Sequence, residues 1–221
     1  MLADSIRARS ADTSFEGRIY GSIILFVKQQ ILSCNTGRTI YDRQFDVVAP
    51  NQVWTTDITY VWTLEGWLYV AVVIDLFSRQ VVGWAIVDHM RTALCVKALQ
   101  MAFWRRKPEP GLLHHSDRGS QYASHEYRSH LSVMKMKQSM SRKGNCWDNS
   151  PTERFFLSLK YEQLNYEKFK TKEKGKEKEK ERLSIIDYLA FYNGKRSHSK
   201  LGYQSPMQFE YIFSVVSGNS T

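Results

Sequence analysis

Three carboxylates in this sequence are placed where a metal-dependent site for phosphate chemistry could form. Asp117 follows a short apolar run, Glu153 lies near the start of an expected helix, and Asp57 belongs to an earlier strand-like run. Acids from two strands and a helix could together hold a pair of hard divalent cations, which prefer oxygen ligands and leave positions open for water and substrate phosphates. We therefore take Asp57, Asp117 and Glu153 as candidate catalytic and metal-binding residues.

Each of these acids also has an ordinary structural explanation. Residues 150–153, Ser-Pro-Thr-Glu, form a capping-box pattern with proline at the first helical position, so Glu153 could serve only to start its helix. Asp117 begins an Asp-Arg-Gly sequence, which is common in turns. One acid alone would be weak evidence, whereas the spacing and placement of all three together favour a site.

Other polar residues nearby compete for a role. Asp75 could replace Asp57 as the acid of the first strands, but its sequence favours bracing its own turn through Ser78 or Arg79. His114 and His115 invite a metal interpretation, yet no partner cluster accompanies them. A strand-end position is favoured for both, with His115 on the same strand face as Asp117 and therefore the better active-site neighbour.

Lys160 follows Glu153 by seven residues, which is two turns of an α-helix. The two side chains are therefore expected on nearly the same side, away from an apolar face formed by Phe155, Phe156 and Leu159. A lysine aligned with a metal ligand is suited to contacting a phosphate. The alternative is an ordinary solvent-exposed helix face.

The surrounding pattern predicts an α/β fold. Three β-rich runs at 56–64, 67–76 and 80–87 are separated by short connections and should be antiparallel neighbours. A helix at 92–104 then allows a strand at 112–116 to run parallel to the first and to lie beside it, which would bring Asp117 near Asp57. The remaining expected elements are a helix at 124–134, a short strand at 136–139, a loop at 141–149 and a long helix from Pro151.

Composition limits the class of protein. The 221 residues suffice for one substantial core, and a net charge of +9 with a pI near 9.4 favours a polyanionic partner such as nucleic acid, although charge can also serve solubility alone. Three widely spaced cysteines form neither a zinc pattern nor an even disulfide set, which favours a reducing compartment. The apolar run at 19–27 is too short to span a bilayer. We expect a cytoplasmic protein.

Composition also suggests boundaries. We expect a divergent N-terminal arm at 1–42, the remnant of a helical DNA-binding region, followed by a catalytic core at 43–166. A Lys- and Glu-rich segment follows at 167–183, interpreted as a solvated helix or loop, and then a C-terminal helical extension at 184–221.

Many short motifs then occur in a recognisable order. They are Pro50–Trp54, Thr56–Tyr60, Glu65–Tyr69, Asp75–Arg79, Val82–Trp84, His114–Tyr122, Ser139–Arg142, Gly144–Asn149, Glu153–Phe156 with Lys160, and Tyr192–Asn193 continuing through Arg196, His198 and Leu201–Tyr203 to Phe209. Between about Arg43 and Phe209 the chain resembles the catalytic subunit of bacterial insertion-sequence transposases with a retroviral-integrase-like (DDE) core.

The resemblance implies an RNase H-like mixed sheet in which Asp57, Asp117 and Glu153 bind two Mg²⁺ or Mn²⁺ ions. It also implies metal-dependent cleavage at the ends of an insertion sequence, followed by strand transfer into target DNA. The expected partners are element-end and target DNA, further copies of the chain in a synaptic complex, an upstream helix-turn-helix protein and no membrane, with the reaction taking place at the bacterial nucleoid. The DNA-contacting candidates are Lys160, Arg142, Trp147 and Arg196.

Two departures from the family pattern keep rivals open. Residues 1–40 do not match the helical DNA-binding region usual before the core, and the Lys/Glu-rich run is expanded. One rival is an RNase H-like nuclease that cleaves without joining strands. The other is a non-catalytic, DNA-binding relic of a transposon.

Overall fold

The computed structural model describes residues 47–141, 150–165 and 178–218. Its centre is a five-stranded sheet in the order β3-β2-β1-β4-β5. The strands are β1 (Val53–Thr63), β2 (Gly66–Asp75), β3 (Val81–Val87), β4 (Leu113–Ser116) and β5 (Lys137–Met140).

Strand pairing follows the connections. The β1–β2 and β2–β3 pairs are antiparallel, whereas β4 lies parallel to both β1 and β5. This confirms the expected α/β fold with three antiparallel and two further parallel strands. The first strand begins at Val53, three residues before its predicted start, because residues 53–55 pair with β4.

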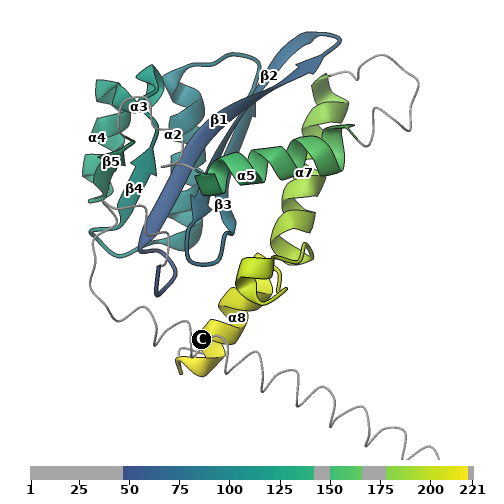
Figure 1. The fold of residues 1–221 in the computed structure, drawn as a ribbon. Helices are drawn as coiled ribbons and strands as arrows, with labels where there is room; N and C mark the ends of the chain where they lie inside the picture. Colours follow the sequence, from purple (N-terminus) through teal and green to yellow (C-terminus); the bar gives the residue numbers. More distant parts are fainter. Residues whose placement is uncertain (1–46, 142–149, 166–177, 219–221) are drawn as a thin grey trace, which may run out of the picture.

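Helices cover both faces of the sheet (Figure 1). One face carries α2 (Thr92–Arg106), α3 (Ser120–Ala123) and α4 (His125–Val133), and the other carries α5 (Ser150–Ser158) and α7 (Lys178–Gly194). The helix of α5 continues as a π-helix, η3 (Leu159–Asn165), and the described chain ends in a 3₁₀ turn, η4 (Ser199–Leu201), and α8 (Pro206–Val216).

The central strand β2 supplies side chains to two separate cores. Its odd-numbered residues Ala71 and Val73 join the core under α2 and α4, and its even-numbered residues Val70 and Val72 join the core under α5 and α7. All four are 0% exposed. Strands buried on both faces are continuously apolar, which is the pattern that the sequence shows here.

The close packing of α2 on the sheet depends on Gly83 in β3. A Cβ atom at this position would lie 2.3 Å from the backbone oxygen of Ala98 and 2.7 Å from the Cβ of Ala102. Contacts this short cannot be relieved by a side-chain rotation, because backbone is on the other side. Glycine therefore sets the distance between α2 and β3.

The C-terminal helix α8 is attached to the core by a buried ion network. Arg106 of α2 donates to both carboxylate oxygens of Glu210 in α8, each at 2.7 Å, and approaches Asp75 of β2 at 3.4 Å. A small apolar cluster around Phe77, Leu201, Phe209 and Ile212 covers the same junction. Helix α8 is therefore attached to the end of α2 and to the turn after β2.

The charged segment is partly helical. Helix α7 begins at Lys178 and continues to Gly194, so the boundary expected at residue 184 falls inside one unbroken helix. The expected arm at 1–42 and residues 167–177 of the charged segment lie outside the described residues. Among the described residues, no helix has the length and apolar character needed to cross a bilayer.

Candidate active site

The register of β1 and β4 determines where the two aspartates lie. Thr55 in β1 is the partner of His115 in β4, and the two strands run in the same direction. Continuing that register by two residues brings Asp57 and Asp117 alongside each other, Asp117 directly after β4 ends. Both side chains are half-buried. The predicted juxtaposition of these two acids therefore follows from the observed pairing.

The third acid is positioned by the packing of α5 across β1. The hydroxyl of Thr152 in α5 donates to the hydroxyl of Thr55 at 2.8 Å, and both residues are 0% exposed. Thr55 lies two residues before Asp57 on the same strand face, and Thr152 immediately precedes Glu153. This buried bond ties the first turn of α5 to the strand that carries Asp57.

Electrostatics indicate that the three carboxylates act on one another. Burial, together with the charges of Asp117 and Glu153, raises the pKa of Asp57 to about 7, against the lowering effect of the Ile58 backbone N–H. Two neighbouring negative charges and partial desolvation both disfavour an ionised carboxylate. The site therefore holds more negative charge than it can stabilise by itself, as expected of a cation-binding site.

The backbone also orients the aspartates. One oxygen of Asp57 accepts from the N–H of Ile58 at 2.7 Å, and one oxygen of Asp117 accepts from the N–H of Gly119 at 2.9 Å. The turn-forming role considered for Asp117 is therefore real, but it uses only one of the two carboxylate oxygens. A ligand role and a turn role are compatible at this residue.

Within the part of the chain that the structure describes, no three His, Cys, Asp or Glu side chains are gathered tightly enough to form a metal site as they stand. The donor set nevertheless fits hard divalent ions, because it consists of carboxylates from three separate elements and includes one with a raised pKa. A cation bound between carboxylates would offset their mutual repulsion.

Comparison with known proteins agrees with this geometry. An integrase core domain model matches residues 47–146, and a second integrase core domain model matches residues 134–206. The transposase InsF of insertion sequence IS3A from Escherichia coli is 45% identical over 172 residues, which are 77% of this chain and 58% of that protein. The two family models together span residues 47–206, and the chain belongs to the integrase core domain family.

Other relatives agree with this assignment. The uncharacterized 31 kDa protein of insertion element IS600 from Shigella sonnei is 44% identical over 170 residues, 77% of this chain and 61% of that protein. The chain thus spans about three fifths of these curated relatives. A solved HTLV-2 integrase catalytic core in complex with magnesium shares the fold, with a TM-score of 0.58 at 18% identity over 74% of this chain and 98% of that one.

The histidines of this integrase core have structural partners. His114 is buried, shares a 2.7 Å hydrogen bond with the hydroxyl of Tyr127, and has its pKa lowered to about 3 by burial. His115 is half-buried and contacts the hydroxyls of Ser139 and Ser141 at 3.0 and 3.2 Å. The contacts of His115 join β4 to the end of β5.

Asp75 braces its turn with different partners from those expected. It accepts from the backbone N–H groups of Asn51 at 2.7 Å and Phe77 at 2.9 Å, and its charge faces Arg106 rather than Arg79. Ser78 instead donates to Glu210. The sequence pattern showed the turn, but it could not show that α2 and α8 would meet there.

The DNA-contacting candidates have varied surroundings. Lys160 lies in the π-helix with its ammonium group 5.4 Å from the ring centre of Tyr60. Because α-helical geometry ends at Ser158, the seven-residue count does not by itself align Lys160 with Glu153. Arg196 is paired with Glu162, at 2.8 Å from its Nε atom. Arg142 and Trp147 lie outside the described residues.

The sequence does not predict the hydrogen bond between Thr55 and Thr152, because residues 150–153 also fit a simple helix start. We expect Thr152→Val to lower the turnover of strand cleavage about tenfold, since small displacements of a catalytic group are costly. It should also reduce the free energy of unfolding by about 1–2 kcal/mol, because the Thr55 hydroxyl stays buried without this partner. Single-turnover cleavage and thermal melts would measure both effects.

Thr152→Ser provides the matched control, because it keeps the hydroxyl. It should recover most of the cleavage rate, and DNA affinity should be the same in both variants. Equal activity of Thr152→Val and the unaltered chain would show that this bond does not position Glu153.

The raised pKa of Asp57 gives a prediction about stability. Its folded pKa of about 7 exceeds the ordinary value of 3.8, so the group favours folding at low pH and this contribution is lost as pH rises from about 4 to 7. Asp57→Asn keeps an acceptor for Ile58 but removes the charge. Without divalent ions at pH 8, we expect it to stabilise the protein by about 1–3 kcal/mol, a range reduced for partial solvent screening.

Thermal melts of the unaltered chain and of Asp57→Asn, in EDTA between pH 4 and 8, would measure this gain in stability. The gain should become smaller toward pH 4. A variant that is less stable than the unaltered chain at pH 8 would contradict the electrostatic origin of the pKa shift.

Proposed function

We propose that this chain is the catalytic part of a DDE transposase, which cleaves DNA at the ends of an insertion sequence and joins those ends to target DNA. The observation that supports the proposal is the register of β1 and β4, in which Thr55 pairs with His115, together with the Thr55–Thr152 bond that ties α5 to β1. The transposase InsF of insertion sequence IS3A supports the same reaction class.

Asp57, Asp117 and Glu153 would hold two Mg²⁺ or Mn²⁺ ions, as three carboxylates with unbalanced negative charge allow. When bound, such ions lower the pKa of an attacking water or 3′-hydroxyl and stabilise the leaving oxygen at phosphorus. Asp57, with its raised pKa, would lose its proton as cations bind. The HTLV-2 integrase catalytic core, which was solved in complex with magnesium, supports this choice of metal.

The partners follow from the same proposal. The substrate is DNA, and we propose Lys160, Arg196, Arg142 and Trp147 as contacts to it, with several copies of the chain joining the two element ends in one complex. We propose that end recognition is supplied by residues 1–42 or by an upstream helix-turn-helix protein. The reaction of a bacterial element would take place at the nucleoid, in the cytoplasm.

A strand-joining assay tests the proposal. The purified chain would be incubated with Mg²⁺, a labelled duplex carrying the DNA that flanks its own gene, and a supercoiled plasmid, with EDTA in the control reaction. We expect labelled plasmid to form only with Mg²⁺. Cleaved duplex without joined product would favour the nuclease instead, and metal-independent binding without any cleavage would favour the relic.

A further inference from the structure

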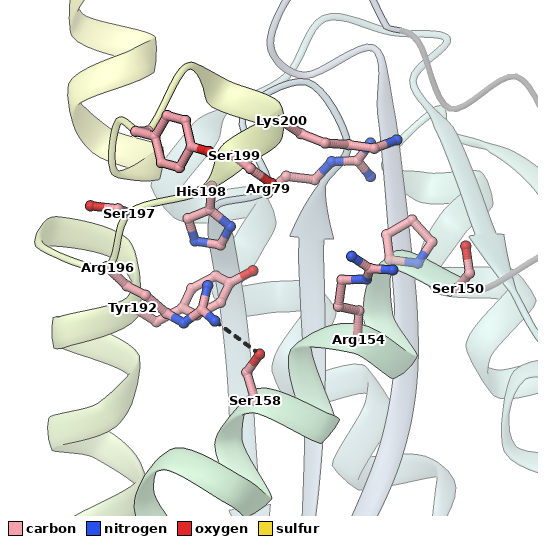
Figure 2. A pocket seen from close by; sticks show the side chains of 12 residues that line it. Arg79, Ser150, Arg154, Ser158, Tyr192, Arg196, Ser197, His198, Ser199 and Lys200 are labelled. Atoms are coloured by element: carbon pink, nitrogen blue, oxygen red, sulfur yellow. Dashed lines mark hydrogen bonds between the residues drawn. The ribbon is translucent and has the colours of Figure 1, made fainter.

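A basic pocket lies between the first turns of α5 and the segment that joins α7 to α8. It encloses about 380 Å³. Four cationic side chains line it, from the turn after β2, from α5 and from the α7–α8 segment: Arg79, Arg154, Arg196 and Lys200. Figure 2 shows Arg154 extending from α5 toward the space that Arg79 and Lys200 reach from the other side. No aspartate or glutamate is among the described residues that line it.

The charges in this basic pocket are unevenly compensated. Arg196 is held by Glu162 and also donates to Ser158 at 3.3 Å. Neither Arg154 nor Lys200 forms an ion pair with another residue that the structure describes. Serine side chains from α5 and from the α7–α8 segment, Ser150 and Ser199 among them, also line the pocket. Cations with hydroxyl donors and without acids form a site for an anion.

In the described chain, His198 contributes an unpartnered ring nitrogen to this part of the molecule. Its Nε2 atom is buried and has no hydrogen-bond partner among the described residues, although His198 lines the same pocket. Burial and the positive charges of Arg196 and Arg79 lower the pKa of His198 to about 4. The ring is therefore neutral at physiological pH, and Nε2 can donate to an anion in one of its two tautomers.

The pocket and the acids share the first turns of α5. Arg154 lines the pocket and directly follows Glu153, so their side chains leave the helix about 100° apart. A helix is about 10 Å across, and a DNA strand advances about 3.4 Å per nucleotide. A strand cleaved beside Glu153 would therefore pass the pocket within a few nucleotides.

We propose that this pocket binds a backbone phosphate of the DNA strand that leaves the active site, with Arg154, Lys200 and Arg79 contacting the phosphate and His198 donating to it. This inference rests on the proposed function, because that function identifies the bound strand as the DNA strand cleaved at the active site. This proposal gives the C-terminal extension at 184–221 a role in binding DNA. That role is separate from the DNA contact proposed for Lys160 in the π-helix.

Binding of a labelled 30-base-pair DNA duplex by the full chain tests this proposal, measured by fluorescence anisotropy over a range of salt concentrations. We expect Arg154→Gln with Lys200→Gln to weaken binding about tenfold or more near 0.1 M salt. The slope of log affinity against log salt should fall in magnitude by about 1, because one phosphate contact is lost. The matched control is Lys97→Gln with Arg128→Gln, two exposed cations on α2 and α4. It should change the slope much less.

Equal losses of affinity and equal slopes in the two double variants would overturn the proposal. A second result would also overturn it. Inorganic phosphate, at constant ionic strength, would compete with DNA for the unaltered chain, and Arg154→Gln with Lys200→Gln would lose this competition but keep its DNA affinity. The pocket would then be a site for free anions. Binding does not require cleavage, so a chain that fails to join strands would refute the proposed function without affecting this measurement.

Discussion

Replacing any one of the three acids should abolish strand chemistry while leaving DNA binding intact. We expect Asp57→Asn, Asp117→Asn and Glu153→Gln each to lower the rate of Mg²⁺-dependent cleavage by about a thousandfold or more, because the three groups act as one unit. Each variant removes one carboxylate from a site in which Asp57 responds to both other charges. Cleavage and joining of labelled DNA would measure the loss.

Glu126→Gln is a suitable control, since it removes an exposed carboxylate in the first turn of α4. It should keep full activity. DNA affinity in EDTA should be equal or slightly higher in the three active-site variants, because each has lost one negative charge. Activity within tenfold of the unaltered chain for any of them would remove that residue from the proposed site.

Replacing Arg106 should have the largest effect on stability. Arg106→Met leaves Asp75, which is 0% exposed, and the nearby Glu210 without their shared cation. Breaking a buried ion pair by removing one partner costs about 3–5 kcal/mol, because an uncompensated charge stays buried. We expect a loss of this size in the free energy of unfolding, measured by urea denaturation, with α8 separating from the core first.

The neighbouring Arg105→Met is the matched control. Arg105 is exposed and lies over the ring of Trp84 at 5.0 Å, an interaction worth about 0.5–1 kcal/mol. A loss in Arg106→Met no larger than in Arg105→Met would show that the network does not hold α8.

The effect of Arg106→Met should depend on pH. Burial and Glu210 raise the pKa of Asp75 to about 6, whereas Arg106 lowers it. Without Arg106 the folded pKa should rise further, so this group favours folding at low pH and the contribution is lost as pH increases. The destabilisation should therefore be smaller at pH 5 than at pH 8.

Much of the sheet could be predicted from the sequence because its signals are local. Short connections between β-rich runs require antiparallel neighbours, and the helix before Leu113 permits a parallel return beside β1. Once β4 pairs with β1, Asp57 and Asp117 each follow the paired residues Thr55 and His115 by two positions. The position of Glu153 followed from the expected helix, although its anchor, the Thr55–Thr152 bond, joins residues far apart in sequence.

The features that could not be predicted depend on tertiary contacts. The change from α5 to a π-helix at Leu159 has no local sequence signal, yet it determines where Lys160 lies. The basic pocket and the Arg106 network both require the residues after α7 to fold back onto the sheet. Isolated motifs around Arg196 and His198 indicate the family but not which surfaces they form.

The most direct test of a shared metal site is a crystal structure of the chain grown with Mn²⁺ and measured at the manganese absorption edge. We predict anomalous density between the carboxylates of Asp57, Asp117 and Glu153. An ordered core without manganese at these acids, in crystals of a chain that still cleaves DNA with Mn²⁺, would contradict the proposed site.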